Sequence, residues 1–170
     1  MTQREDRDEA FSHFVTTSAA SLTRLAWFLT GNMDLARDVV QEAYVKTYAA
    51  WRRVRSGEAL LYARAVVVNA NIDRLRRRHG EVALAEDFDQ VDPTDTASAV
   101  SQRDEVARLL AGLPTRQRQV VVLRYVLDLS EQDTAAELGI SVGTVKSASS
   151  RALASLRTRI TLLEKETEHV

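Results

Sequence analysis

The sequence predicts an all-α protein of two small helical domains joined by a flexible acidic linker, with a helix-turn-helix in the second domain. Glycine and proline are scarce, with 6 and 2 residues among 170, so few positions interrupt a helix. Apolar residues recur every three or four positions along most of the chain, which is the period of an amphipathic helix. That period is lost between residues 80 and 100, where acidic and turn-forming residues surround Pro93. We therefore expect domains at 10–79 and 101–163, separated by a linker at 80–100.

Composition excludes several classes of protein. The chain has no cysteine, so it has no disulfide and no thiolate metal site, and nothing requires an oxidising compartment. The first residues, MTQREDRDEAFSHF, lack the apolar core of a signal peptide, and nowhere do about 18 apolar residues run together. A cytoplasmic protein without membrane insertion is expected.

Catalytic and metal chemistry have little support. His13, His79 and His169 lie in three separate regions, and none has a metal-ligand companion at helical spacing. The chain has no glycine-rich phosphate loop and no plausible pair of nucleophile and base. Asp38 and Glu42 are four residues apart on one predicted helix face, but exposed carboxylates are poor candidates for acid–base catalysis. We expect no enzyme, no cofactor and no metal.

Charge is segregated along the chain, although the net charge is only −1. Eight arginines lie between Arg52 and Arg78, against the two acids Glu58 and Asp73. The stretch from Glu81 to Asp95 carries six acids and no cation. The near-neutral average therefore hides a basic segment, of the kind that binds polyanions, followed by an acidic one.

The first domain is predicted to begin with two helical regions. Residues 1–9 are charged and expected to be loose, and 10–30 form two helices, or one with a break near 16–18, ending at Gly31-Asn32. The next helix begins at Asp34, and its apolar residues form a wide stripe expected to be buried: Leu35, Val39, Val40, Ala43, Tyr44, Tyr48 and Trp51. Four other residues share the opposite face by their spacing: Asp38, Gln41, Glu42 and Val45. The simplest interpretation of that face is exposure to solvent.

A basic loop from Arg52 to Glu58 precedes a third helix, expected from about Ala59 to Arg78. The residues expected to pack inward are Leu61, Tyr62, Ala65, Val66, Val68, Ile72 and Leu75. Those expected to project along another side are Arg64, Asn71, Arg74, Arg77 and Arg78. Asn69 and Asn71 are unusual inside a helix, because Asn competes for backbone hydrogen bonds, and a satisfied structural role is the simplest interpretation of both. The arginine run 76–78 continues the basic loop, which favours a polyanion surface over solubilising charge.

The second domain is predicted to begin with a short helix. Ser101 with Asp104 predicts a capping box, and the helix would run through Leu110 with Val106, Leu109 and Leu110 facing inward. Gly112 and Pro114 stop it. Thr115 then starts another helix, TRQRQVVVLRYVLD.

A helix-turn-helix is predicted from Leu129 to Arg159. Ser130, followed by Glu131 and Asp133, starts its first helix, in which the small residues Ala135 and Ala136 would let a second helix approach closely. Gly139 supplies the left-handed backbone conformation that ends this helix, and Ser141 caps the next. The inner face of that second helix is expected to contain Val142, Val145, Ala148 and Ala152.

The outer face of the second helix suits DNA. It displays short hydrogen-bonding groups and two cations but no acid: Ser141, Thr144, Lys146, Ser147, Ser150 and Arg151. In a major groove, phosphates require positive charge and base edges require donors and acceptors. The alternative is an ordinary helical hairpin with a solvated polar face, but the spacing of Ala135, Gly139 and Val145 favours DNA binding.

Three segments, in this order, resemble an extracytoplasmic-function (ECF) sigma factor of bacterial RNA polymerase. LARDVVQEAYVKTYAAW is similar to the family's region 2.2, and LLYARAVVVNANIDRLRRR is similar to regions 2.3 and 2.4. LPTRQRQVVVLRYVLDLSEQDTAAELGISVGTVKSASSRAL is similar to region 4. The resemblance covers about 11–159 and implies that the first domain binds core polymerase and opens the minus-ten element, while the second recognises the minus-thirty-five element.

The resemblance also implies roles for individual residues. Those on the core-polymerase face would be Asp38, Gln41, Glu42 and Val45. Those near the single-stranded minus-ten element would be Arg52, Arg53, Arg55, Asn69, Arg74, Arg76 and Arg77, with the loop Arg52 to Ala59 holding an unstacked base. Those at the minus-thirty-five duplex would be Ser141, Thr144, Lys146, Ser147, Ser150 and Arg151. The chain departs from the family pattern at Ala148, where a long polar residue is common, and at Ser149, where an apolar residue is common.

Two other classes stay open at this point. One is a helix-turn-helix activator or repressor that does not confer initiation on core polymerase and would dimerise to read paired half-sites. The other is a protein-binding adaptor that uses the acidic helix face. The sequence leaves open which promoters are recognised and whether an anti-sigma factor binds the chain.

Overall fold

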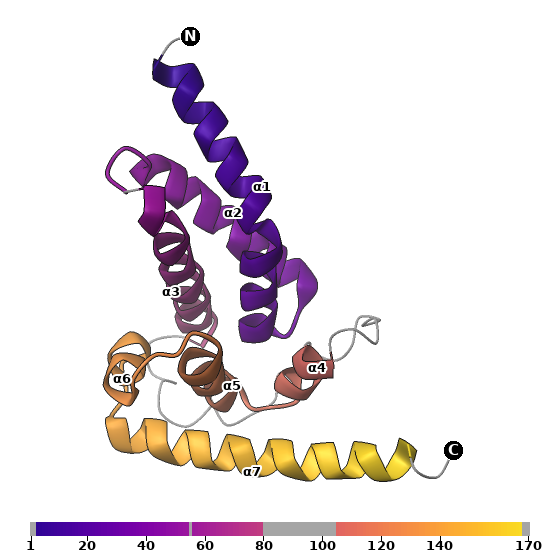
Figure 1. Ribbon diagram of the computed structural model, residues 1–170. Coiled ribbons are helices and arrows are strands. Elements are labelled where there is room, and N and C mark those ends of the chain that lie inside the picture. The colour runs from indigo at the N-terminus through magenta and orange to yellow at the C-terminus, as the bar shows by residue number, and fades with distance from the viewer. Residues whose placement is uncertain (1–2, 55, 80–104, 168–170) are drawn as a thin grey trace. The chain divides into compact units, whose positions relative to one another are not determined.

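The structure is a computed structural model that describes residues 3–54, 56–79 and 105–167, and within these ranges every regular element is helical (Figure 1). The chain divides into two compact units, Met1–Arg78 and His79–Val170. Each unit contains buried apolar residues of its own, such as Leu22 and Leu29 in the first and Leu113 and Leu123 in the second. The all-α, two-domain prediction is confirmed.

The first unit begins with one uninterrupted helix, α1 (Gln3–Thr30). The predictions of loose residues at 1–9 and of a break near 16–18 are therefore wrong for the residues described. The break fails because the polar side chains bond within the helix: Thr16 Oγ1 donates to the Ser12 carbonyl at 3.0 Å, and Ser18 Oγ donates to the Phe14 carbonyl at 2.7 Å. A hydroxyl that bonds the preceding turn stays inside a helix instead of ending it.

An aromatic cluster holds the N-terminal turns of α1 against the end of α2 (Met33–Ala50). It consists of Phe11, Phe14, Tyr44, Tyr48 and Trp51, all half-buried, with ring centroids 4.9 to 6.3 Å apart in the contacting pairs. Such pairs add to the stability gained from burial alone.

Polar contacts reinforce the same attachment. The Arg7 guanidinium lies 4.7 Å from the centroid of the Tyr48 ring, and the Tyr48 hydroxyl donates to Asp8 Oδ1 at 2.7 Å. The hydrogen bond between Arg7 and the Tyr48 hydroxyl raises the pKa of Arg7 above its ordinary value. Charged residues near the N-terminus are thus ordered by partners about forty positions away.

The second helix starts one residue before the predicted Asp34. Gly31, at φ 69°, ends α1, and Asn32 caps α2 by accepting from the backbone N–H groups of Asp34 and Leu35 at 2.9 and 3.0 Å. The residues that this helix buries fully are Ala36, Val39, Val40, Ala43 and Thr47. The predicted stripe was too wide, because Leu35 and the aromatic cluster's Tyr44, Tyr48 and Trp51 are half-buried.

A short 3-10 turn, η1 (Ser56–Glu58), leads into α3 (Ala59–His79). Its buried residues are Ala59, Ala63, Val67, Val68, Ala70, Asn71, Ile72 and Leu75. Four predictions for this helix are wrong: Leu61, Tyr62 and Ala65 are exposed, and Asn71 is buried with 1% exposure. Because α3 carries apolar residues on more than one side, the periodicity did not fix its inner face, and the small residues Ala63 and Val67 occupy the core instead.

The second unit contains α4 (Glu105–Ala111), α5 (Thr115–Val121), the π-helical turn η5 (Val122–Val126), α6 (Glu131–Leu138) and the long α7 (Val142–Thr167). Figure 1 shows α5 and α6 on the same side of α7, which both helices contact. In α4, Ala107 and Leu110 are buried, whereas Val106, predicted inward, is exposed. The predicted capping box at Ser101 and Asp104 lies outside the described residues.

Close approach at Gly112 ties the end of α4 to α7. The Arg159 guanidinium donates to the Gly112 carbonyl, and it fills the space that a Cβ at Gly112 would need. The helix after Thr115 does not run regularly to Asp128 as predicted, because Leu127 N–H bonds the Val122 carbonyl five residues back, at 3.0 Å. This π turn ends the helix and redirects the chain toward α6.

In the part of the chain that the structure describes, no helix combines the length and the apolar composition needed to span a membrane.

Candidate functional site

Local hydrogen bonds shape the helix-turn-helix as the sequence predicted. Ser130 Oγ accepts from the Asp133 N–H at 3.0 Å and so caps α6. Gly139, at φ 63°, ends α6 in a Schellman motif, with its own N–H on the Ala136 carbonyl and the next N–H on the Ala135 carbonyl. Ser141 Oγ then accepts from the Thr144 N–H at 3.1 Å and starts α7. The predicted roles of Ser130, Gly139 and Ser141 at the helix ends are all confirmed.

Small apolar residues are buried in both α6 and α7. Ala135, Val145, Ala148 and Ala152 are buried, which allows the two helix backbones to approach closely. Ala136, expected beside Ala135, is exposed, so that prediction is wrong, and Val142 is only half-buried.

The outer face of α7 carries every residue that the sequence assigned to the minus-thirty-five element, and all six are exposed: Ser141, Thr144, Lys146, Ser147, Ser150 and Arg151. Beyond the Ser141 cap they form two rows along the helix. Thr144, Ser147 and Arg151 follow one another at intervals of three and four, and we call this row the central stripe. Lys146 and Ser150 belong to a second row that continues through Leu153 to Arg157 at the same intervals, and we call this row the edge stripe.

The two positions that depart from the family pattern both lie off the central stripe. Ala148 is buried, and Ser149 is half-buried, with its hydroxyl 3.1 Å from the Tyr125 hydroxyl on η5. Sequence reasoning missed this contact, because the two residues are 24 positions apart and η5 was predicted as regular helix. The contact joins the π turn to the middle of α7.

An ion pair connects α6 to the edge stripe. Glu131 Oε2 lies 3.6 Å from Lys146 Nζ, and their side chains retain 36% and 64% of their exposure. Glu131, Lys146, Ser149, Ser150, Leu153 and Arg157 line a depression of about 320 Å³ between the two helices. The sequence shows the individual charges, but it does not predict that α6 brings Glu131 to the predicted DNA face.

On α2, the structure brings together the four residues predicted for the polymerase face. Asp38, Gln41 and Val45 are exposed and Glu42 is half-exposed, with Glu42 Oε1 2.7 Å from Lys46 Nζ. Val45, a large apolar side chain that is 66% exposed, lies beside these acidic groups. An exposed apolar side chain among charged groups gives a protein partner an apolar contact.

The residues predicted for single-stranded DNA divide between the end of α2 and the side of α3. Arg52, Arg53, Asn69, Arg76 and Arg77 are exposed, while Arg74 is half-buried. Arg55 lies outside the described residues. Asp73 lies among these cations, 3.9 Å from Arg76 Nη1, and its carbonyl accepts from Arg77 Nε at 3.3 Å. The acid reduces the positive charge of α3 only in part, because Arg74 and Arg77 lie on the same helix beside the Asp73–Arg76 pair.

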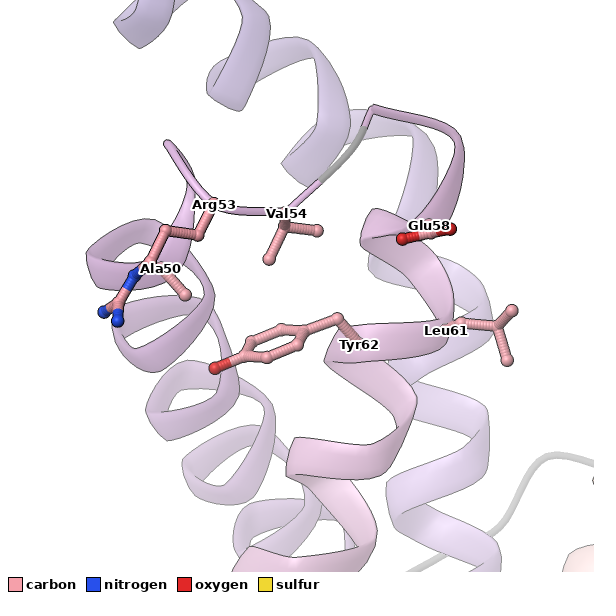
Figure 2. A pocket seen from close by; sticks show the side chains of 6 residues that line it. All are labelled: Ala50, Arg53, Val54, Glu58, Leu61 and Tyr62. Carbon is pink, nitrogen blue, oxygen red and sulfur yellow. The ribbon is translucent and has the colours of Figure 1, made fainter.

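A hollow of about 580 Å³ lies where the end of α2 meets the start of α3, lined by Ala50, Arg53, Val54, Glu58, Leu61 and Tyr62 (Figure 2). The Tyr62 ring extends from α3 toward α2, while Leu61 points the other way (Figure 2). The sequence missed both residues by placing them in the core. The available signal was their adjacency, since neighbouring residues on a helix point in directions about 100° apart.

A helix-turn-helix whose second helix carries no acid between Ser141 and Arg151, in a chain that also carries a separate basic surface, defines a helical DNA-binding protein. Residues 6–81 match the family described as Sigma-70 region 2, and residues 103–156 match Sigma-70, region 4. The chain belongs to the sigma-70 family of RNA polymerase sigma factors, in its ECF group. It is therefore a transcription initiation factor, as the sequence resemblance implied.

Individual relatives extend over most of the chain. It is 36% identical over 148 residues to the RNA polymerase sigma-E factor of Streptomyces avermitilis, covering 86% of this chain and 83% of that protein. It is 28% identical over 175 residues to the ECF RNA polymerase sigma factor SigW of Bacillus subtilis, covering 93% and 92%. The fold is similar to that of the sigma factor RpoE of Bartonella quintana, solved in complex with the anti-sigma factor NepR, with a TM-score of 0.59 and 24% identity over 89% of this chain and 96% of that one.

Proposed function

We propose that this sigma factor binds core RNA polymerase through Asp38, Gln41, Glu42 and Val45, recognises the minus-thirty-five duplex with α7, and holds the opened minus-ten strand on its basic surface. The observation that carries the proposal is the outer face of α7, which exposes short polar groups and two cations but no acid between Ser141 and Arg151. Such a face is suited to a DNA groove.

The assignment within α7 follows from side-chain chemistry. Thr144 and Ser147 carry hydroxyls that both donate and accept, so they suit base edges. Lys146 and Arg151 carry charge that suits phosphates, which contribute affinity without reading sequence. The central stripe would thus enter the major groove, with its cation at the groove wall.

The α2 surface is assigned to polymerase because its chemistry is unsuitable for DNA. Asp38 and Glu42 would repel phosphates, whereas the exposed Val45 gives a protein partner an apolar contact. The match of residues 6–81 to Sigma-70 region 2 supports the same assignment.

The hollow of Figure 2 is assigned to an unstacked base of the minus-ten strand. Tyr62 provides an aromatic face for stacking, and Arg53 provides charge for an adjacent phosphate. An anti-sigma factor is a further candidate partner, by analogy with the Bartonella complex.

Run-off transcription with purified core polymerase tests the function as a whole. Adding the full chain to core should produce a transcript of defined start from a cognate promoter, where core alone gives none. A chain that binds the minus-thirty-five duplex yet leaves core inactive would instead be a helix-turn-helix regulator of the alternative class.

A further inference from the structure

The depression between α6 and α7 has the chemistry of a phosphate site. It collects two cations, Lys146 and Arg157, and two hydroxyls, Ser149 and Ser150, over the apolar Leu153. Cations and hydroxyls are the side chains that most often contact the DNA backbone. Its volume of about 320 Å³ leaves room for an anionic group at its surface.

The edge stripe also has the dimensions of a backbone contact. Lys146 and Arg157 are eleven residues apart on one helix, which places their backbone positions about 16 Å apart along the helix axis. Phosphates of one DNA strand advance about 3.4 Å each along the duplex. Where α7 follows the course of one strand, the two cations would contact separate phosphates, on the flank of the central stripe and not within it.

Glu131 already occupies this position in the free chain. Its carboxylate lies 3.6 Å from Lys146 Nζ, where a DNA phosphate would otherwise bind the ammonium group. Both side chains are more than a third exposed, so the ion pair is screened and weak, and a phosphate is able to displace the carboxylate. Each displacement still costs the energy of the lost pair.

From these contacts we propose that Lys146, Ser150 and Arg157 form a second phosphate-binding site beside the central stripe, and that Glu131 competes with DNA for it. The inference rests on the proposed DNA-binding role of α7 and adds two residues to it, Arg157 as a contact and Glu131 as an internal competitor. Glu131 thereby lowers the affinity for duplex of any sequence. Phosphate contacts then contribute less to DNA affinity than they would without Glu131, and recognition of the minus-thirty-five element depends more on the central stripe.

Two pairs of variants of the full chain test the site. Arg157→Ala should weaken binding to a fluorescein-labelled duplex of scrambled sequence and reduce the slope of log affinity against log salt by about 0.9. Lys165→Ala removes the same charge from an exposed position two turns further along α7 and is its control.

Glu131→Gln should raise the affinity for the same duplex about 1.5- to 5-fold, most at low salt. Glu137→Gln, an exposed acid on the same helix, is its control.

A third comparison isolates the competition. If Glu131 acts through Lys146, then Glu131→Gln gives no gain when Lys146 is already Ala. Circular dichroism of every variant verifies that helix content is unchanged. If Arg157→Ala and Lys165→Ala change DNA affinity equally, or if Glu131→Gln and Glu137→Gln do, the effect depends only on net charge and the proposal is overturned. A gain in affinity from Glu131→Gln that persists when Lys146 is Ala would also overturn it.

Failure of the underlying function gives a different pattern. If Lys146→Ala and Arg151→Ala both leave duplex binding unchanged, α7 is not the DNA surface, and the proposed function and this inference fall together. If those two variants weaken binding while Arg157→Ala does not, only the second phosphate site is wrong.

Discussion

At the scale of single residues, Asn71 is a polar side chain buried in the middle of α3. Its side chain is 1% exposed, and neither amide atom has a hydrogen-bond partner in the described part of the chain. An unsatisfied buried amide costs roughly 1–3 kcal/mol, and Asn is also a weaker helix former than Ala. Asn71 therefore lowers the stability of the first unit at a position in the middle of α3.

Replacing Asn71 with Ala should raise the free energy of unfolding by about 1 kcal/mol, since loss of the unsatisfied amide outweighs the small cavity. Urea denaturation followed by circular dichroism measures the change. Asn69→Ala is the control, because Asn69 is exposed on the same helix and reports helix propensity alone, about 0.5 kcal/mol. A smaller gain at Asn71 than at Asn69, or a loss, would mean that the buried amide has a stabilising partner.

At the scale of elements, α2 contributes residues to three different surfaces. One side supplies Val39 and Val40 to the core, and the C-terminal turns supply Tyr48 and Trp51 to the aromatic cluster. The remaining side presents the predicted polymerase face, centred on the exposed Val45. Because the core and the cluster fix the helix from two directions, charge changes on its outer side should leave its structure intact.

Reversing Asp38 and Glu42 to Lys should therefore weaken core-polymerase binding about tenfold or more while changing helix content little. Pull-down of core by the tagged chain, with circular dichroism of the same samples, measures both. Asp6→Lys with Glu9→Lys is the matched control, since it makes the same change in net charge at exposed positions of α1. The polymerase face is misassigned if the two double variants capture core equally well.

Across the whole molecule, stability is divided between two separate cores. Leu22 is fully buried in the first unit and Leu123 is almost fully buried in the second, and the chain separates into these units by its own internal contacts. A cavity in one core removes packing from the helices around it. Its effect should then be confined to the unit that contains it.

Leu22→Ala should cost the first unit about 2–5 kcal/mol and speed amide hydrogen exchange across 3–79, while protection across 105–167 stays unchanged. Leu123→Ala should do the reverse. Exchange measured by mass spectrometry after proteolysis assigns each loss to its unit. Loss of protection in both units from either variant would show that the two cores unfold together.

The sequence by itself determined the features that depend on residues close together in the chain. Ser130, Gly139 and Ser141 each act on backbone groups within a few positions, so the helix-turn-helix was predictable from residue type and spacing. The same holds for the exposed stripe on α7, because helical spacing alone determines which residues share a face. Membership of the family was equally visible in the order of three contiguous motifs.

Only the tertiary structure decided the features that depend on distant partners. The first turns of α1 are ordered because Tyr48 and Trp51 lie against them, and in α3 it is Ala63 that is buried while Tyr62 is exposed. The pairing of Glu131 with Lys146 has the same origin, since it exists only after α6 packs on α7. Local signals fix helix ends and periodicity, but burial and charge pairing are settled by packing between elements that the chain brings together only when it folds.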